Sequence, residues 1–154
     1  MNNVVVINTL QKFTEHWDFL EEGFAVLTAP KAGGFTTLSR KDYQRLLLCS
    51  AIGGDTQGVI LMLTSKKGYK LGFVSLLDDS NFLHPNRLEI FCIYSNGKCP
   101  SAYEELSFEA QSWARRRGFG ELTFNIHRNT GCAREFAKNK LHLDPGPLQF
   151  KQKL

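Results

Sequence analysis

Apolar residues recur with two periods along the chain, and each change of period marks a boundary between predicted elements. Asn2–Leu10, with the run VVVI, predicts an opening strand. Helices are predicted at Thr14–Glu22, with Thr14 as the N-cap, and at Ser39–Ser50, which begins with a relative of the capping box. The Gly- and Thr-rich stretch Thr28–Leu38 between them predicts a loop.

Three predicted strands follow, at Gly58–Thr64, Lys70–Leu77 and Arg87–Tyr94. The first two are joined by SKKGY, which is typical of a short hairpin connection. Side chains alternate between the two faces of a strand, and the third strand reads LEIFCIY. The alternation predicts that Glu89, Phe91 and Ile93 project from one face. It also predicts a core position for Cys92, on the same face as Ile90 and Tyr94.

The most regular amphipathic pattern covers residues 101–117, where Leu106, Ala110 and Trp113 form one apolar stripe. Ser101 and Glu104 match a capping box, and Gly118 can take the left-handed conformation that ends a helix. The preceding loop, SNGKCP, ends at the helix N-terminus. Unpaired backbone N–H groups and the helix dipole favour an anion there.

A strand at 121–127, a helix at 130–140 and a strand pair at 141–143 and 148–153 complete the pattern. No linker or repeat divides the sequence, so a single domain over 1–154 is predicted. Its class is α+β, with a mixed, mostly antiparallel central sheet flanked by helices. The helix at 101–117 connects 87–94 to 121–127, which predicts one parallel strand pair that splays at the crossover.

Composition narrows the class of protein. A hydrophobic content of 42% and a charged content of 22% are ordinary for a globular domain. No apolar run approaches the ~20 residues of a membrane span, and the first residues lack the features of a signal peptide. A cytoplasmic protein without membrane contact is expected. The four Cys and four His lack metal-ligand spacing, so no metal site is expected.

The basic excess is confined to the C-terminal third. Residues 1–97 contain nine Lys/Arg and nine Asp/Glu, whereas residues 98–154 contain ten against six. This distribution suits a phosphorylated ligand. Nucleic acid is the weaker interpretation, because no recognition-helix or RNP-type signature is present and Arg115–Arg117 lie at a helix C-terminus, where cations are favoured.

The strand, loop, helix, strand and helix of residues 88–140 resemble the cofactor-binding core of the GNAT superfamily, which transfers acyl groups from coenzyme A to amines. The family tends toward the motifs Q/R-x-x-G-x-G/A, W-A-x-x-x-G and N-x-x-A-x-x-x-Y. Placing Trp113–Gly118 on the second motif fixes the others without gaps. The matching positions are then Ile93 for a valine-like residue, Lys98 for Q/R, Ser101 and Tyr103 for the glycines, Asn129, Cys132 for Ala and Phe136 for Tyr.

The resemblance implies an N-acyltransferase that moves an acetyl or other acyl group from acyl-CoA to an amine acceptor, either a small molecule or a protein amine. It implies that the backbone of Cys92 and Ile93 pairs with pantetheine. The other implied cofactor-binding residues are Lys98, Cys99, Ser101, Ala102, Tyr103 and Asn129. Glu89 is the candidate general base, because desolvation on a half-buried strand beside a substrate channel would raise the pKa of its carboxylate toward a value useful for taking an amine proton. The alternative is that Glu89 pairs with Arg87 or a Lys in solvent.

Two residues depart from the family pattern. Tyr103 adds a bulky side chain where a glycine or alanine lets the backbone approach a pyrophosphate. Phe136 lacks the phenol that protonates the leaving thiolate in many GNAT enzymes. The alternative function is therefore a catalytically degenerate protein of this fold that acts as a binding or assembly component, as some small divergent viral GNAT-like proteins do. Cys99, beside Lys98 at a helix N-terminus, is in addition a candidate reactive thiol.

Overall fold

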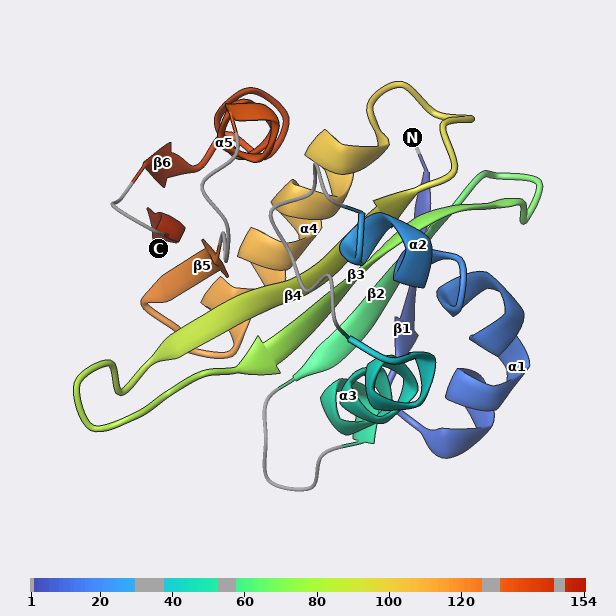
Figure 1. Cartoon of the computed structure of the whole chain (residues 1–154), viewed down its shortest axis with the longest axis horizontal. Coiled ribbons are helices and arrows are strands. Elements are labelled where there is room, and N and C mark those ends of the chain that lie inside the picture. Colours follow the sequence, from blue (N-terminus) through green and yellow to red (C-terminus); the bar gives the residue numbers. More distant parts are fainter. Residues whose placement is uncertain (1, 30–37, 53–57, 126–130, 146–148) are drawn as a thin grey trace.

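The computed structural model describes residues 2–29, 38–52, 58–125, 131–145 and 149–154. The strands of this part of the chain form one seven-stranded sheet in the order β1-β2-β3-β4-β5-β7-β6 (Figure 1). The strands are β1 Asn3–Ile7, β2 Val59–Thr64, β3 Lys70–Asp78, β4 Arg87–Ser95, β5 Glu121–Asn125, β6 Asp144–Pro145 and β7 Gln149–Lys153. Of the strand pairs described, β4–β5 alone is parallel. The predicted mixed, mostly antiparallel sheet is confirmed.

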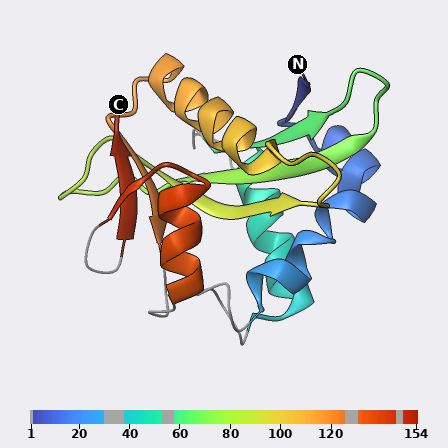
Figure 2. The same cartoon turned by 90° about the horizontal axis from the view of Figure 1, so that it is seen from above.

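Helices cover both faces of the sheet (Figure 2). α1 (Leu10–Leu20), α2 (Gly23–Leu27) and α3 (Arg40–Ile52) lie on one face, and α4 (Ala102–Arg116) lies on the other. Ala137 of α5 (Gly131–Asn139) joins the apolar cluster under α4. The sheet thus separates two hydrophobic clusters. The α+β class, with helices flanking a central sheet, is confirmed.

Of the two predicted N-terminal helices, the first begins earlier than predicted and the second has its predicted cap. The helix at Thr14–Glu22 is wrong in its start, because α1 begins at Leu10 and Thr9 is its N-cap. The Thr9 hydroxyl oxygen accepts a 3.2 Å hydrogen bond from the Lys12 N–H. Thr14 instead donates to the Leu10 carbonyl within the helix. The cap predicted at Ser39 is confirmed, since its side chain accepts from the Asp42 N–H at 3.1 Å.

The long helix α4 confirms its predicted C-terminus but not its predicted N-terminal cap. Gly118 has φ +82°, the left-handed conformation that favours glycine after a helix. The Arg117 guanidinium lies 4.5 Å from the ring centroid of Trp113. The capping box of Ser101 with Glu104 is wrong, because the Ser101 side chain makes no cap bond and donates to Glu105 Oε2 at 2.7 Å instead.

A β-bulge interrupts β4 on the edge that pairs with β3. Cys92 is opposite Ser75 and Ile90 is opposite Leu76, so Phe91 is an extra residue in β4. A bulge of this kind bends the strand and shifts the side-chain alternation beyond it by one position. Bulges therefore change which residues reach which face of the sheet.

The bulge corrects the predicted faces of β4. Ile90 and Ile93 pack in the cluster under α4, whereas Phe91 and Cys92 pack in the cluster under α1 and α3. The prediction that Ile93 shares a face with Glu89 and Phe91 is therefore wrong. Cys92 is buried, as predicted, but on the face opposite Ile90.

The C-terminal part pairs back onto the sheet. β7 is antiparallel to β5, and β6 is a two-residue strand that pairs with β7. The strand predicted at 141–143 is wrong, since Leu141 and Leu143 precede β6 and bury their side chains in the core under α4. No helix in the described residues is long and apolar enough to cross a membrane.

Candidate functional site

The parallel pair β4–β5 separates soon after it begins. Pairing covers only Arg87–Glu89 of β4 and Glu121–Thr123 of β5. Beyond Glu89, β4 continues for six residues to Ser95 with β3 on one edge, and β5 no longer pairs with its other edge. This confirms the predicted splay. The two strands diverge from Glu89 and Thr123 onward, and the region between them is called the opening below, with its vertex at these two residues.

The open edge of β4 presents backbone hydrogen-bonding groups. The Asn96 N–H donates to the Leu71 carbonyl at 3.0 Å, toward β3. Because successive residues of a strand point their N–H groups to alternate edges, Ser95 and Ile93 present theirs to the opening. Cys92 is opposite Ser75, and by the same alternation its backbone N–H points toward β3 and away from the opening. Of the two residues predicted to pair with pantetheine, Ile93 therefore has its backbone on the open edge.

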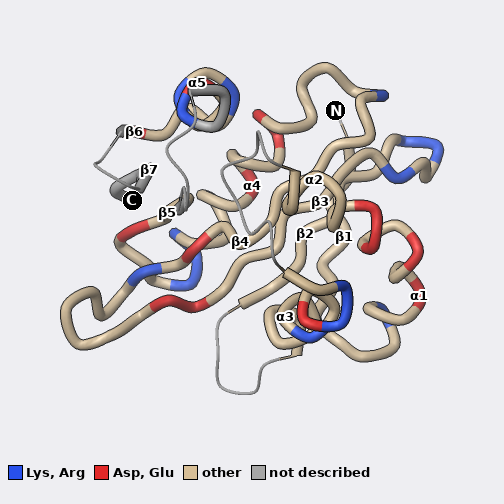
Figure 3. Tube along the Cα trace, in the orientation of Figure 1, with Lys and Arg blue, Asp and Glu red and all other residues tan. Residues whose placement is uncertain are grey.

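The loop between β4 and α4 follows the end of β4 that lies away from the vertex. Gly97 has φ +81°, and its N–H donates to Ser95 Oγ at 3.2 Å. Lys98 is exposed, and its N–H donates to Asn96 Oδ1 at 3.1 Å. Figure 3 shows a basic position at the tip of this loop and, further along the chain, the acidic first turn of α4. The loop thus holds one cation at the N-terminus of a fifteen-residue helix.

A carboxylate already occupies part of this helix N-terminus. Glu105 accepts hydrogen bonds from Ser101 Oγ at 2.7 Å and from Asn2 Nδ2 at 3.0 Å, and the Cys99 thiol lies 3.5 Å from it. Two predicted cofactor-binding residues, Cys99 and Ser101, therefore point their side chains to Glu105. Ala102 is fully buried in the core under α4.

Three aromatic rings pack together beside the opening. The Tyr103 ring is perpendicular to the Phe136 ring, with centroids 4.8 Å apart, and Phe136 in turn contacts Phe124 of β5 at 6.2 Å. Burial raises the pKa of Tyr103, and a hydrogen bond between its hydroxyl and the backbone of Ser95 partly offsets that rise. Tyr103 of α4 therefore lies between Ser95 of β4 and Phe136 of α5.

The vertex of the opening holds a polar pair. Glu89 is half-buried and is opposite Thr123 in the parallel register, which places the two residues side by side. Thr123 is fully buried, and its Oγ1 has no hydrogen-bond partner among the residues that the structure describes. A buried hydroxyl without a partner costs about 1–3 kcal/mol. Sequence reasoning identified Glu89 and missed Thr123, because only the register reveals that the two residues are neighbours.

A second polar contact involves Tyr94, on the face of β4 that packs under α1 and α3. The Tyr94 hydroxyl donates to Glu22 Oε1 at 3.1 Å, at the junction of α1 and α2. Burial and the Glu22 carboxylate raise the pKa of Tyr94 to about 12. Burial raises the pKa of the neighbouring Cys92 to about 12 as well, opposed by a hydrogen bond to Tyr43. The Cys92 thiol is therefore protonated at neutral pH.

Two further positions of the predicted motifs, Asn129 and Cys132, are described only in part or not at all. Asn129 lies outside the described residues, and for Cys132 the described structure gives the helix α5 alone. In the described residues, no group of three or more His, Cys, Asp or Glu side chains is arranged to hold a metal ion.

The sequence matches no protein-family model and no curated protein. Solved structures do match. The GNAT domain of S. lividans PAT has a TM-score of 0.67 at 15% identity, over 99% of this chain and 90% of that one. The yncA protein of Salmonella typhimurium, solved with its cofactor acetyl-CoA, has a TM-score of 0.65 at 12% identity, over 98% and 94% of the two chains. The PaiA N-acetyltransferase of Thermoplasma acidophilum, in complex with coenzyme A, has a TM-score of 0.59 at 15% identity, over 99% of each chain.

Proposed function

Because the chain has the fold of the GNAT N-acetyltransferases, we propose that it is an acyl-CoA-dependent N-acyltransferase. One observation carries the proposal. The β4–β5 pairing ends after three residue pairs, so beyond Glu89, the candidate base, no described strand pairs with that edge of β4. In an ordinary parallel sheet that edge would be covered by its neighbour along its whole length.

The unpaired edge fits a ligand that carries amide groups. Ile93 and Ser95 present backbone groups that an extended pantetheine chain, with two amides, is able to satisfy. Lys98 and the N-terminal N–H groups of α4 suit the pyrophosphate. The negative charge of Glu105 at the same helix N-terminus disfavours the pyrophosphate. The Tyr103 ring must also turn away from Ser95 before a ligand can reach the edge of β4. The fit is therefore conditional on a movement of Tyr103.

The chemistry proposed for the vertex is the removal of a proton. Coenzyme A supplies the acyl group as a thioester, whose carbonyl carbon an amine nitrogen attacks. Glu89, directly or through a water molecule bound to the Thr123 hydroxyl, accepts the proton that the amine loses. Backbone N–H groups on the open edge of β4 stabilise the negative charge on the thioester oxygen. The thiolate leaves and takes a proton from water, since Phe136 has none to give.

A thermal-stability measurement tests the cofactor site. A ligand present at about 100 times its Kd adds ~2.7 kcal/mol to the free energy of unfolding. Coenzyme A should therefore raise the melting temperature of the purified protein, and dephospho-coenzyme A, which keeps the pantetheine and the pyrophosphate, should do so as well. No shift with either compound at millimolar concentration would contradict the proposal.

The aromatic cluster favours a second function. Tyr103, Phe136 and Phe124 together fill the side of the opening next to α5. If that packing is permanent, the chain is a binding or assembly protein that keeps the GNAT fold without its cofactor. The same melting experiment separates the two functions, because a permanently filled opening leaves coenzyme A without effect.

A further inference from the structure

The loop of residues 79–86, between β3 and β4, exposes two large apolar side chains. Phe82 is 100% exposed and Leu83 is 79% exposed. The loop extends from the end of the sheet that lies far from the β4–α4 loop (Figure 1). A fully exposed phenylalanine next to a leucine is unfavourable in water, so these side chains indicate a contact surface.

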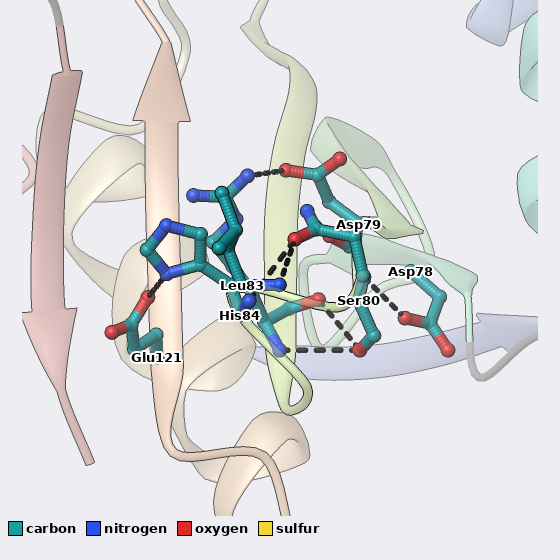
Figure 4. A network of polar contacts seen from close by, with 8 residues as sticks. Asp78, Asp79, Ser80, Leu83, His84 and Glu121 are labelled. Carbon is teal, nitrogen blue, oxygen red and sulfur yellow. Dashed lines mark hydrogen bonds and ion pairs between the residues drawn. The ribbon is translucent and has the colours of Figure 1, made fainter.

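The 79–86 loop is held in one shape by polar contacts (Figure 4). Arg87 and Asp79 form an ion pair at 2.8 Å, and the Asn81 side chain accepts from the N–H groups of Leu83 and His84 at 2.9 and 3.0 Å. His84 Nδ1 lies 3.4 Å from Glu121 Oε2 at the start of β5. A loop that is already ordered loses little conformational entropy when it binds a partner.

A pocket of about 260 Å³ opens beside these apolar side chains. Its walls come from the loop and from the start of β5: Leu83, His84, Pro85, Asn86, Gly120 and Glu121. For comparison, an apolar cavity of about 150 Å³ binds benzene. The pocket is therefore large enough for one phenyl ring. The Phe82 side chain of the same molecule does not fill it, because that side chain is fully exposed.

We propose that the partner of this surface is a second copy of the chain, in a two-fold dimer in which Phe82 of each copy enters the pocket of the other. The exposed Phe82 side chain, called the knob below, lies beside the pocket on the same surface. Such a surface is complementary to a second copy of itself. A two-fold axis passing between the knob and the pocket satisfies both halves of the contact at once, as an isologous interface requires. The contact lies away from the β4–α4 loop and so leaves the proposed cofactor site accessible.

Gly120 allows the pocket to be filled without disturbing the chain that carries it. A Cβ built at Gly120 meets no atom within 4 Å, and the backbone there has no positive φ that would strain a side chain. Gly120→Leu therefore places a side chain in the pocket from within. It leaves the knob unchanged, whereas Phe82→Ser removes the knob and leaves the pocket unchanged.

Sedimentation velocity of the full chain from about 1 to 100 μM measures the dimer dissociation constant. We expect a concentration-dependent dimer in the wild type, weakened at least tenfold by Phe82→Ser and by Gly120→Leu. Tyr69→Ser, which removes a 65% exposed aromatic ring from the β2–β3 connection, is the matched control and should leave the dimer unchanged. Melting temperatures within a few degrees of the wild type show that each variant is folded.

Two results would overturn the proposal. A wild type that sediments as a monomer throughout, as it would if Phe82 served as an anchor for a membrane or another protein, removes the second copy as the partner. A dimer that Phe82→Ser weakens and Gly120→Leu leaves intact would mean that the knob docks outside this pocket.

Discussion

Tyr103→Ala is expected to tighten coenzyme A binding while it destabilises the protein that binds it. In the structure Tyr103 makes a perpendicular ring contact with Phe136 at 4.8 Å and a hydrogen bond with the backbone of Ser95. Both contacts must break before a ligand reaches the open edge of β4. The unliganded protein is thus stabilised by contacts that compete with the proposed cofactor.

The size of the effect follows from those two contacts. An aromatic pair contributes about 0.5–1.5 kcal/mol beyond its buried area, and a neutral hydrogen bond contributes about 0.5–1.5 kcal/mol. Their sum, ~1–3 kcal/mol, corresponds to roughly 5- to 150-fold weaker binding in the wild type than in a chain whose opening is free. The free energy of unfolding should fall by about 2 kcal/mol, less than the ~3–5 kcal/mol for a fully buried aromatic residue.

Isothermal titration calorimetry with coenzyme A, together with urea unfolding, measures both effects. Tyr103→Phe keeps the ring contact and loses the bond to Ser95, so it should give a smaller gain in affinity. Phe108→Ala removes a 62% exposed ring from the same helix and should change neither quantity. A folded Tyr103→Ala protein that binds coenzyme A no more tightly than the wild type would refute this account of the opening.

Three further variants test the residues around the opening. Thr123→Val should raise the melting temperature by about 2–4 °C, because it removes a buried hydroxyl that has no partner in the described part of the chain. It should also lower the rate of thiol release if that hydroxyl holds a reacting water. A variant that is neither more stable nor slower would exclude this role. Lys98→Glu should weaken coenzyme A binding in calorimetry by about tenfold, whereas Arg116→Glu at the far end of α4 should have little effect; equal effects would move the pyrophosphate away from the β4–α4 loop. Phe136→Tyr should leave the thiol-release rate unchanged or raise it, since a phenol is restored at small steric cost, and a large loss of rate would count against the opening as the site of reaction.

The sequence predicted the elements whose signals are local. Helix α4 followed from its apolar stripe, and its C-terminal end followed from Gly118. The sheet class and the splay followed from element order, because a strand–helix–strand crossover inside an otherwise antiparallel series allows few arrangements. The short helix α2 was missed, since five residues carry no periodic pattern.

Features that depend on pairing between strands were beyond the sequence. The bulge at Phe91 arises from the register of β3 with β4, and it moved Ile93 to the face opposite the one predicted. The hydrogen bond from Ser101 to Glu105 was not predicted. The Ser101 hydroxyl can either accept from a backbone N–H of the helix or donate to the carboxylate four residues ahead, and the sequence does not decide between the two. The proximity of Glu89 to Thr123 likewise follows only from the register of β4 with β5.

Release of free thiol from acetyl-CoA, measured against a panel of small-molecule amines and lysine peptides, tests the proposed activity most directly. We expect amine-dependent release by the wild type that falls at least tenfold in Glu89→Gln, since the amide cannot accept the proton that the attacking amine loses. Binding alone would not give this result. An active wild type indifferent to Glu89→Gln would remove Glu89 from the mechanism. A wild type inert toward every amine, and equally inert after Tyr103→Ala frees the opening, would contradict the acyltransferase itself.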